Sequence, residues 1–199
     1  MRYIIKNIKD YNFYELSSFY KIIPKYKADK IKCLVKENSR ISSIIGEILL
    51  KDLLDYHNLC YNDLVYYTNF YGKPYIKNCK FFYNISHSFD YVITIISKKE
   101  IGVDIEKIRK TSLNSINYFA TKSEKMYILS SDCDVYERIF KIYTLKEAYF
   151  KMIGSNLDNI LSVEFVIDGN DVFCSDNTVN AGFISDINEY IIAYCERKF

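Results

Sequence analysis

Two carboxylates separated by one residue stand in the segment Ile101-Gly102-Val103-Asp104-Ile105-Glu106. On a β-strand alternate side chains face opposite sides, so Asp104 and Glu106 face one side together and the apolar residues face the other. Paired carboxylates repel each other unless a cation or a basic group lies between them. With no histidine or cysteine in this segment, the pattern favours an oxygen-ligated ion such as magnesium. The alternative is the solvent-facing edge of an amphipathic strand.

A second candidate is the segment from Tyr143 to Lys151, Y-T-L-K-E-A-Y-F-K. In a helix, Glu147 and Lys151 are four residues apart and share a face, as do Tyr143 and Glu147. Glu147 would then lie among aromatic side chains rather than on a fully polar surface. The alternative is an ordinary surface Glu–Lys pair, which stabilises a helix by only a few tenths of a kcal/mol.

The third candidate is Asn84-Ile85-Ser86-His87-Ser88, at the end of an expected strand. One of the two histidines of the chain lies here between two hydroxyls. The alternative is a structural histidine with satisfied hydrogen bonds. Ser86, His87 and Asp90 are too close along one strand end to be assumed a catalytic triad, because the members of a triad must meet in space.

The order of four motifs, G-K-P, N-I-S-H-S, G-V-D-I-E and Y-T-L-K-E-A-Y-F-K, resembles that of the 4'-phosphopantetheinyl transferases. It is most similar to the surfactin-synthetase-activating type, whose chain is built of two similar halves. The resemblance spans roughly residues 20 to 155 and extends to the spacing between motifs. There are two departures: Tyr143 stands where the family commonly has tryptophan, and Ser42 stands where it often has arginine.

The resemblance implies a metal site and a reaction centre. Asp104, Glu106 and Glu147 would hold magnesium, with manganese as an alternative, on the pyrophosphate of coenzyme A. Lys151 would lie beside the phosphates. Glu147 is also the candidate for the base that accepts the proton of the attacking serine, and a role as metal ligand alone stays open.

The resemblance also implies a coenzyme A site. Its contacts would come from Lys27, Lys30, Ser43, Lys73, Ser86, His87, Lys146 and Lys151. Lys27 and Lys30, on an expected basic helix, would bind the 3'-phosphate, with Ser43 as a hydroxyl neighbour. Lys73 of the G-K-P turn would lie on the nucleotide side.

The implied activity is transfer of the 4'-phosphopantetheine group of coenzyme A to a serine of an apo acyl or peptidyl carrier protein, giving holo-carrier and 3',5'-ADP. Spare positive charge could steer an acidic carrier. The enzyme would be a monomer of the holo-[acyl-carrier-protein] synthase class. The alternatives are a metal-dependent phosphodiester hydrolase and a non-catalytic module that binds carrier proteins or coenzyme A. A nucleic-acid binder is disfavoured, because the chain has no recognised fold signature and little net charge.

The elements that must position these residues read as an α+β fold. Strands are expected at residues 1–8, 64–71, 81–86, 91–97, 101–106, 163–167, 182–184 and 190–195. Helices are expected at 25–35, 41–56 and 135–153, with a shorter one capped by Thr121, and Gly154 ends the last. The resemblance adds two similar halves, 1–99 and 100–199, packed as a pseudo-twofold body.

The bulk composition fits one compact protein of 199 residues with 49% hydrophobic residues. The 27 basic and 25 acidic residues nearly balance, at a formal net charge of +2. Basic residues nevertheless concentrate between Lys21 and Arg40, a pattern typical of an anion-binding surface or of a solvated helix face. The six cysteines are scattered singly, and we expect reduced thiols. No signal peptide or membrane span is recognisable, so we expect a cytoplasmic protein.

Overall fold

The computed structural model describes residues 1–130 and 134–199, without the side chains of Phe13 and Glu15. Its first half holds a three-stranded antiparallel sheet in the order β1-β5-β4. The strands are β1 (Arg2–Asn7), β4 (Phe82–Ser88) and β5 (Tyr91–Ser97). The long helix α3 (Glu37–Tyr56) packs against this sheet, with α1 (Phe13–Phe19) and α2 (Lys25–Lys32) beside it. A small hairpin, β2 (Tyr66–Thr68) and β3 (Pro74–Ile76), joins α3 to β4.

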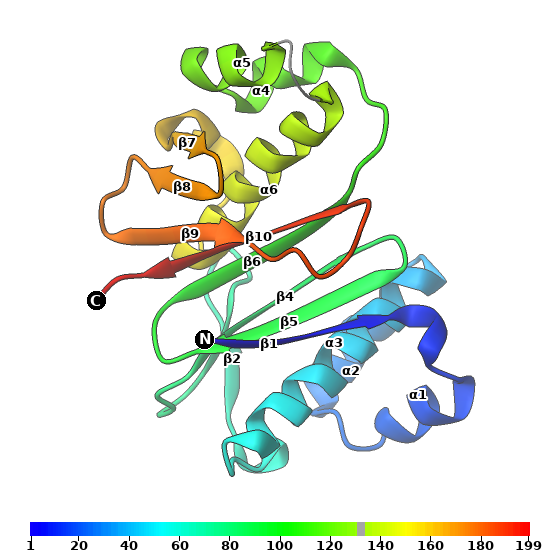
Figure 1. Cartoon of the computed structure of the whole chain (residues 1–199). Helices are drawn as coiled ribbons and strands as arrows, with labels where there is room; N and C mark the ends of the chain where they lie inside the picture. The colour runs from blue at the N-terminus through cyan, green and yellow to red at the C-terminus, as the bar shows by residue number, and fades with distance from the viewer. Residues whose placement is uncertain (131–133) are drawn as a thin grey trace.

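The second half repeats this arrangement with different side chains. Its sheet has the order β6-β10-β9 and consists of β6 (Ile101–Lys107), β9 (Val179–Phe183) and β10 (Tyr190–Arg197). Helix α6 (Val135–Ile153) covers it, after α4 (Ile116–Phe119) and α5 (Lys122–Leu129). A second small hairpin, β7 (Phe165–Asp168) and β8 (Asp171–Cys174), again follows the long helix. In both halves the first strand pairs with the last, and the last with the one before it. The expected α+β fold of two similar halves is thus confirmed, with α3 and α6 on the outer sides (Figure 1).

Between the two sheets lies a core of aliphatic side chains contributed by both halves. Ile93 and Ile95 of β5 meet Ile101, Val103 and Ile105 of β6 there. The expected alternation of β6 is therefore confirmed on its apolar side. The other side of β6 does not face solvent, however, because α6 covers it. A Cβ at Gly102 would come within 2.1 Å of the Ala148 carbonyl oxygen. The division at residue 99 into separate units stays a prediction.

Helix α6 begins and ends where the sequence predicts. The Asp134 side chain accepts a hydrogen bond from the Tyr136 N–H at 2.8 Å, which satisfies one free donor of the first turn. At the other end Gly154 adopts φ +67°, the left-handed conformation in which glycine has no steric penalty. Helix α5 starts with a capping box between Thr121 and Glu124. Local signals thus fix the helix that carries much of the candidate site.

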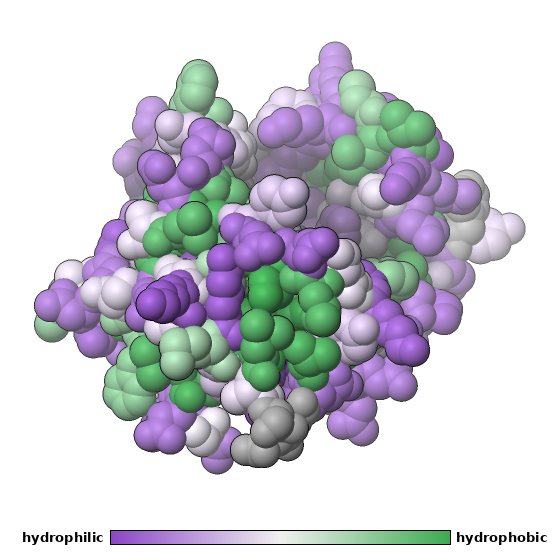
Figure 2. Space-filling model, turned by 90° about the horizontal axis from the view of Figure 1, so that it is seen from above, coloured by the Kyte–Doolittle hydropathy of each residue, from purple (hydrophilic) through white to green (hydrophobic). Residues whose placement is uncertain are grey.

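The sequence did not predict α1, β3 or β8. Short 3-10 turns occupy Ile8–Asp10, Tyr61–Asp63, Leu113–Ser115 and Leu157–Ser162. Figure 2 shows apolar side chains gathered among hydrophilic ones on the face viewed there. The exposed residues of α4 and α5 include Tyr118, Met126 and Leu129.

Five cysteines within the described residues are free thiols, and Cys133 lies outside them. No helix in the described ranges is both long and apolar enough to cross a membrane.

Candidate active site

The edges of the two sheets meet along β4 and β6, and side chains rather than a backbone ladder join them. Asn84 Oδ1 accepts from the Val103 N–H at 3.0 Å, and Ser86 Oγ donates to Asp104 Oδ1 at 2.7 Å. Two residues further along both strands, Ser88 Oγ donates to Glu106 Oε2 at 3.2 Å. Because the offset between partners stays at 18 or 19 residues, the two strands run in the same direction. Alternate residues of the N-I-S-H-S motif therefore line up with the G-V-D-I-E motif.

Asp104 occupies the centre of this seam and is only 4% exposed. Besides Ser86, its Oδ1 accepts a charge-assisted bond from Lys151 Nζ of α6 at 2.5 Å. Its second oxygen, Oδ2, is buried and has no hydrogen-bond partner among the residues that the structure describes. A buried carboxylate oxygen left without a partner is costly, and a bound cation is one way to satisfy it.

Glu106 lies nearer the surface and has a basic partner that sequence reasoning did not single out. Arg109 Nη1 donates to Glu106 Oε2 at 2.9 Å and to the Lys107 carbonyl oxygen, also at 2.9 Å. The signal was present as the basic run that follows the D-x-E motif. Arg109 thus holds the second carboxylate of the pair in place.

Glu147 faces the same region from α6. Tyr143 Oη donates to Glu147 Oε1 at 2.8 Å, and the Tyr143 ring contacts Phe119 edge-on, so the tyrosine packs as an aromatic as expected. Burial raises the pKa of Glu147, and the negative charges of Asp104 and Glu106 raise it further against the opposing effect of Tyr143 and Lys151. The three carboxylates are therefore close enough to affect one another electrostatically.

The carboxylate oxygens of Asp104, Glu106 and Glu147 suit a hard divalent ion, but the three carboxylates are not gathered around one point. Among the described residues, no three His, Cys, Asp or Glu side chains surround a common point closely enough to hold a metal. Lys151 occupies one oxygen of Asp104 instead, and Tyr143 occupies one of Glu147. Carboxylate oxygens, one of them buried without a partner, match the ligand preference of magnesium.

A groove of about 390 Å³ lies on the other side of β4. Lys27, Lys30, Ser43 and His87 line it, so the structure brings four of the predicted coenzyme A contacts together. His87 and Ser86 point to opposite sides of the strand, as neighbours in a strand do. Desolvation lowers the pKa of His87, and the positive charge of Lys151 lowers it further against the opposing effect of Asp104.

Lys27 does not reach into this groove as a free cation. Its Nζ donates to Glu47 Oε2 at 2.6 Å and lies 3.7 Å from the centroid of the Tyr66 ring, and the residue is buried. Desolvation lowers the pKa of Lys27, opposed by Glu47. Glu47 was missed in the sequence, where it reads as one polar residue in an amphipathic helix. Lys30 remains exposed.

Lys73 and Lys146 depart from their expected places. Lys73 is buried, and its ammonium donates to the carbonyl oxygen of Met152 at the end of α6. Lys146 is fully buried in the core of the second half, where Nζ pairs with Glu124 at 2.8 Å and donates to the Ile160 and Val163 carbonyl oxygens. This corrects the expectation that Lys146 contacts coenzyme A, because a lysine with these three acceptors has no free donor to offer.

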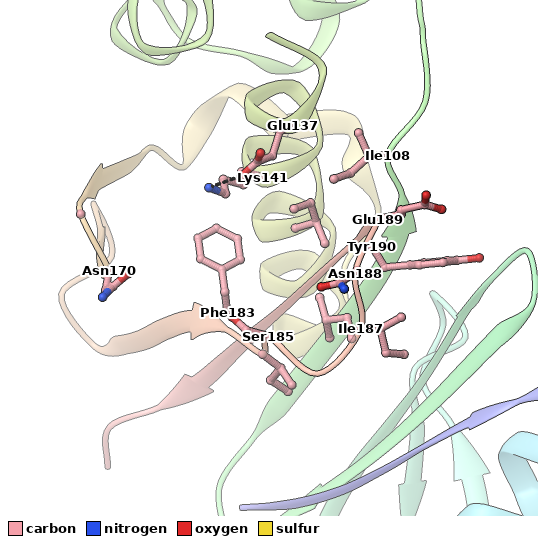
Figure 3. Close-up of a pocket in the computed structure, with 14 residues that line it drawn as sticks. Ile108, Glu137, Lys141, Asn170, Phe183, Ser185, Ile187, Asn188, Glu189 and Tyr190 are labelled. Atoms are coloured by element: carbon pink, nitrogen blue, oxygen red, sulfur yellow. Dashed lines mark ion pairs between the residues drawn. The ribbon is translucent and has the colours of Figure 1, made fainter. Parts of the chain in front are cut away.

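A separate pocket of about 540 Å³ lies against the first half of α6 (Figure 3). Its walls include the ion pair of Glu137 and Lys141, the Phe183 ring and the loop from Ser185 to Glu189. The pocket contains none of the predicted site residues. The candidate active site is therefore the seam between the halves, with the groove beside it.

Comparison with known proteins points to the family that the motifs resemble. The family model of the 4'-phosphopantetheinyl transferase superfamily matches residues 100–195. The chain is 31% identical over 117 residues to the 4'-phosphopantetheinyl transferase gsp of Aneurinibacillus migulanus, covering 58% of this chain and 49% of that protein. It is 28% identical over 146 residues to the 4'-phosphopantetheinyl transferase Sfp of Bacillus subtilis strain 168, covering 72% and 65%.

The chain thus spans about half to two thirds of the length of these curated relatives. Among solved structures, the holo-[acyl-carrier-protein] synthase of Thermotoga maritima overlaps 49% of this chain and 62% of that one, with 21% identity and a TM-score of 0.43. That overlap is too partial to add to the sequence matches. The sequence matches confirm the resemblance drawn from the motifs: the chain is similar to 4'-phosphopantetheinyl transferases, and its residues 100–195 match the model of their superfamily.

Proposed function

We propose that this protein transfers the 4'-phosphopantetheine group of coenzyme A to a serine of an apo carrier protein. The observation that carries the proposal is the meeting of Ser86, Asp104 and Lys151, which come from β4, β6 and α6 and from both halves of the chain. A lysine and an unsatisfied carboxylate at one buried seam suit a phosphate group and its metal ion. The relatives named as 4'-phosphopantetheinyl transferases support the same activity.

Asp104, Glu106 and Glu147 would hold magnesium, with manganese as an alternative. When bound, the ion would neutralise charge on the pyrophosphate of coenzyme A. Ser88 and Arg109 orient Glu106, while Tyr143 orients Glu147. Lys151, whose side chain is 29% exposed, would pass from Asp104 to the incoming phosphate, which would give its ammonium a new anionic partner.

In the reaction, the carrier serine oxygen attacks the β-phosphorus and its bond to phosphorus forms as the bond to the departing 3',5'-ADP breaks. The serine proton needs an acceptor. Glu147 is our candidate, because its raised pKa brings it nearer to the working pH than an ordinary glutamate. Lys151 would offset the negative charge that grows on the leaving group.

The groove lined by Lys30, Ser43 and His87 would take the nucleotide end of coenzyme A, with Lys27 contributing only if it leaves Glu47. We expect an acidic acyl or peptidyl carrier protein as the second substrate, and a monomeric enzyme in the cytoplasm. Lys146 is left out of the site for the reason given above.

The test is to incubate the protein with coenzyme A, magnesium and an apo carrier, then weigh the carrier by mass spectrometry. A gain of one phosphopantetheine group supports the transferase. Consumption of coenzyme A without a carrier would favour a phosphodiester hydrolase, and binding without any reaction a non-catalytic module.

The matched variant is Asp104→Asn, which keeps the size of this buried side chain while removing its charge. It should abolish transfer and leave the fold intact by circular dichroism. Full transfer by that variant would remove Asp104 from the metal site.

A further inference from the structure

The C-terminal end of α6 is held by a segment from the other half of the molecule. The loop between β2 and β3, residues 69–73, packs against Gly154, where a Cβ would come within 2.7 Å of Asn69 Nδ2 and 2.8 Å of Lys73 Cδ. Gly154 is therefore required twice, once for its positive φ and once for this close approach. The contact joins residues more than eighty positions apart.

Asn69 uses its whole side-chain amide in this contact. Its Nδ2 donates to the Gly154 carbonyl oxygen at 2.7 Å, while its Oδ1 accepts from the Tyr71 and Lys73 N–H groups at 3.0 and 2.9 Å. The accepting oxygen shapes the loop, and the donating nitrogen ties the loop to the helix end. One residue thus couples the conformation of the hairpin to the position of α6.

Lys73 makes the second tie. Its ammonium is buried and donates to the Met152 carbonyl oxygen, one of the acceptors that a helix leaves unpaired at its C-terminus. A cation at this end also interacts favourably with the helix dipole. Burial lowers the pKa of Lys73 to about 8, against the opposing effect of the negative charge of Glu100.

The same helical turn carries Lys151. Its Nζ lies 3.0 Å from Ser86 Oγ and 2.5 Å from Asp104 Oδ1. Lys73, Gly154 and Lys151 also line one small pocket of about 230 Å³. A shift of the last turn of α6 would therefore move Lys151 directly.

We propose that Asn69 and Lys73 are positioning residues that hold the last turn of α6, so that Lys151 stays aimed at Ser86 and Asp104. The inference rests on the proposed transfer reaction. It also gives the lysine of the G-K-P turn a role without contact to coenzyme A. The hairpin of the first half then serves the reaction through the helix of the second half.

A double-mutant cycle tests whether Asn69 acts through Lys151. Asn69→Ala should lower kcat for phosphopantetheine transfer by about tenfold to a hundredfold, as expected for a displaced reacting group, with KM for coenzyme A changed less than about twofold. In a Lys151→Ala background the same substitution should change kcat by less than about twofold. Equal losses in both backgrounds would overturn the proposal.

Lys73 is tested by a graded pair. Lys73→Met should lose activity in the same way, and Lys73→Arg should restore part of it, because arginine can still donate to Met152. Thr68→Ala and Lys77→Met are the matched controls, since both side chains are exposed on the same hairpin. Comparable losses in the controls would count against a specific role.

Amide hydrogen exchange on the intact protein separates this inference from the proposed function. In Asn69→Ala, residues 150–155 should exchange at least about tenfold faster while residues 135–146 stay unchanged. Unchanged exchange at 150–155 would sink the inference even in an active transferase. A wild-type protein that transfers nothing would sink the proposed function, and the exchange data would still decide whether the hairpin holds the helix.

Discussion

Two lysines of α6, five residues apart, lie in different environments. At 3.6 residues per turn, Lys146 and Lys151 point to different sides of the helix. Lys146 lies fully buried in the core of the second half and has three acceptors: Glu124, Ile160 and Val163. Lys151 keeps 29% of its side chain exposed at the seam between the halves and reaches Asp104 and Ser86.

The difference lies in how completely each ion pair is satisfied. An ammonium has three donors, and around Lys146 all of them have acceptors. At the other pair, Asp104 Oδ2 has no hydrogen-bond partner within residues 1–130 and 134–199. A saturated buried pair holds a core together and can admit nothing new. An incomplete pair can exchange its partner for a phosphate or a metal ion, which is what the proposed reaction needs.

The largest expected effect is on stability, at the saturated pair. Lys146→Met would leave the Glu124 carboxylate buried without its cation and should lower the free energy of unfolding by about 3–5 kcal/mol. Urea denaturation measures this loss. The double variant Lys146→Met/Glu124→Gln should recover part of it, because no buried charge is then left alone and the amide oxygen can still accept from the Phe165 N–H. A single variant as stable as the wild type would remove the contrast between the two lysines.

Lys151→Ala should have the opposite effects, a large loss of activity and a smaller loss of stability. We expect transfer to slow by about a hundredfold to a thousandfold, the loss seen when one group that stabilises developing charge is removed. The stability loss should be smaller than for Lys146→Met, because Lys151 is partly exposed and water can replace it. Single-turnover kinetics and urea unfolding on the same sample make the comparison. Wild-type kcat in this variant would place the reaction elsewhere.

Glu147→Gln should lower the transfer activity and raise the stability of the fold. The raised pKa of Glu147 means that the folded protein holds this proton more tightly than the unfolded chain does. Deprotonation therefore destabilises the fold, and the wild type loses stability as pH rises above the unfolded pKa of a glutamate. The variant should melt at a higher temperature than the wild type at pH 7, and the difference should shrink toward pH 4. A difference that grows in acid would reverse the sign and refute the assignment.

The smallest effect should appear at α2, where the same contrast recurs between a buried and an exposed lysine. Lys27 is paired with Glu47, whereas Lys30 is exposed. Lys30→Met should weaken binding of 3',5'-ADP by no more than about fivefold, typical of one solvent-exposed ion pair, with unchanged stability. Lys27→Met should instead destabilise the fold, since the half-buried Glu47 would lose its cation and keep the Tyr61 hydroxyl as a donor. Calorimetric titration and thermal melting distinguish them, and identical behaviour of both variants would contradict the difference in burial.

Much of the fold was predictable because its signals are local. The bounds of α6 follow from an N-cap aspartate and a C-terminal glycine, and the strands β5 and β6 from apolar alternation. Helix α1 and the short strands β3 and β8 were missed, because elements of this length are stabilised by packing rather than by their own periodicity.

The candidate site was only partly predictable. Motif order nominated Asp104, Glu106, Glu147 and Lys151, yet it also nominated Lys146, which is structural. Glu47 and Asn69 carried no motif, because their partners Lys27 and Gly154 are 20 and 85 residues away in the sequence. Arg109 is only three residues from Glu106, but it was not singled out within its basic run.

By itself the sequence determined which side chains lie on which face of each strand and helix, since the periods of 2 and 3.6 residues are set by backbone geometry. It thereby determined that Asp104 and Glu106 point together, away from Ile105. Only the tertiary structure decided that α6 covers that face, that Lys151 and not Lys146 reaches Asp104, and that Lys27 and Lys73 are turned inward. The physical reason is that burial and ion pairing depend on neighbours that are distant in the sequence, some of them from the other half of the chain, and no local pattern encodes which neighbour arrives.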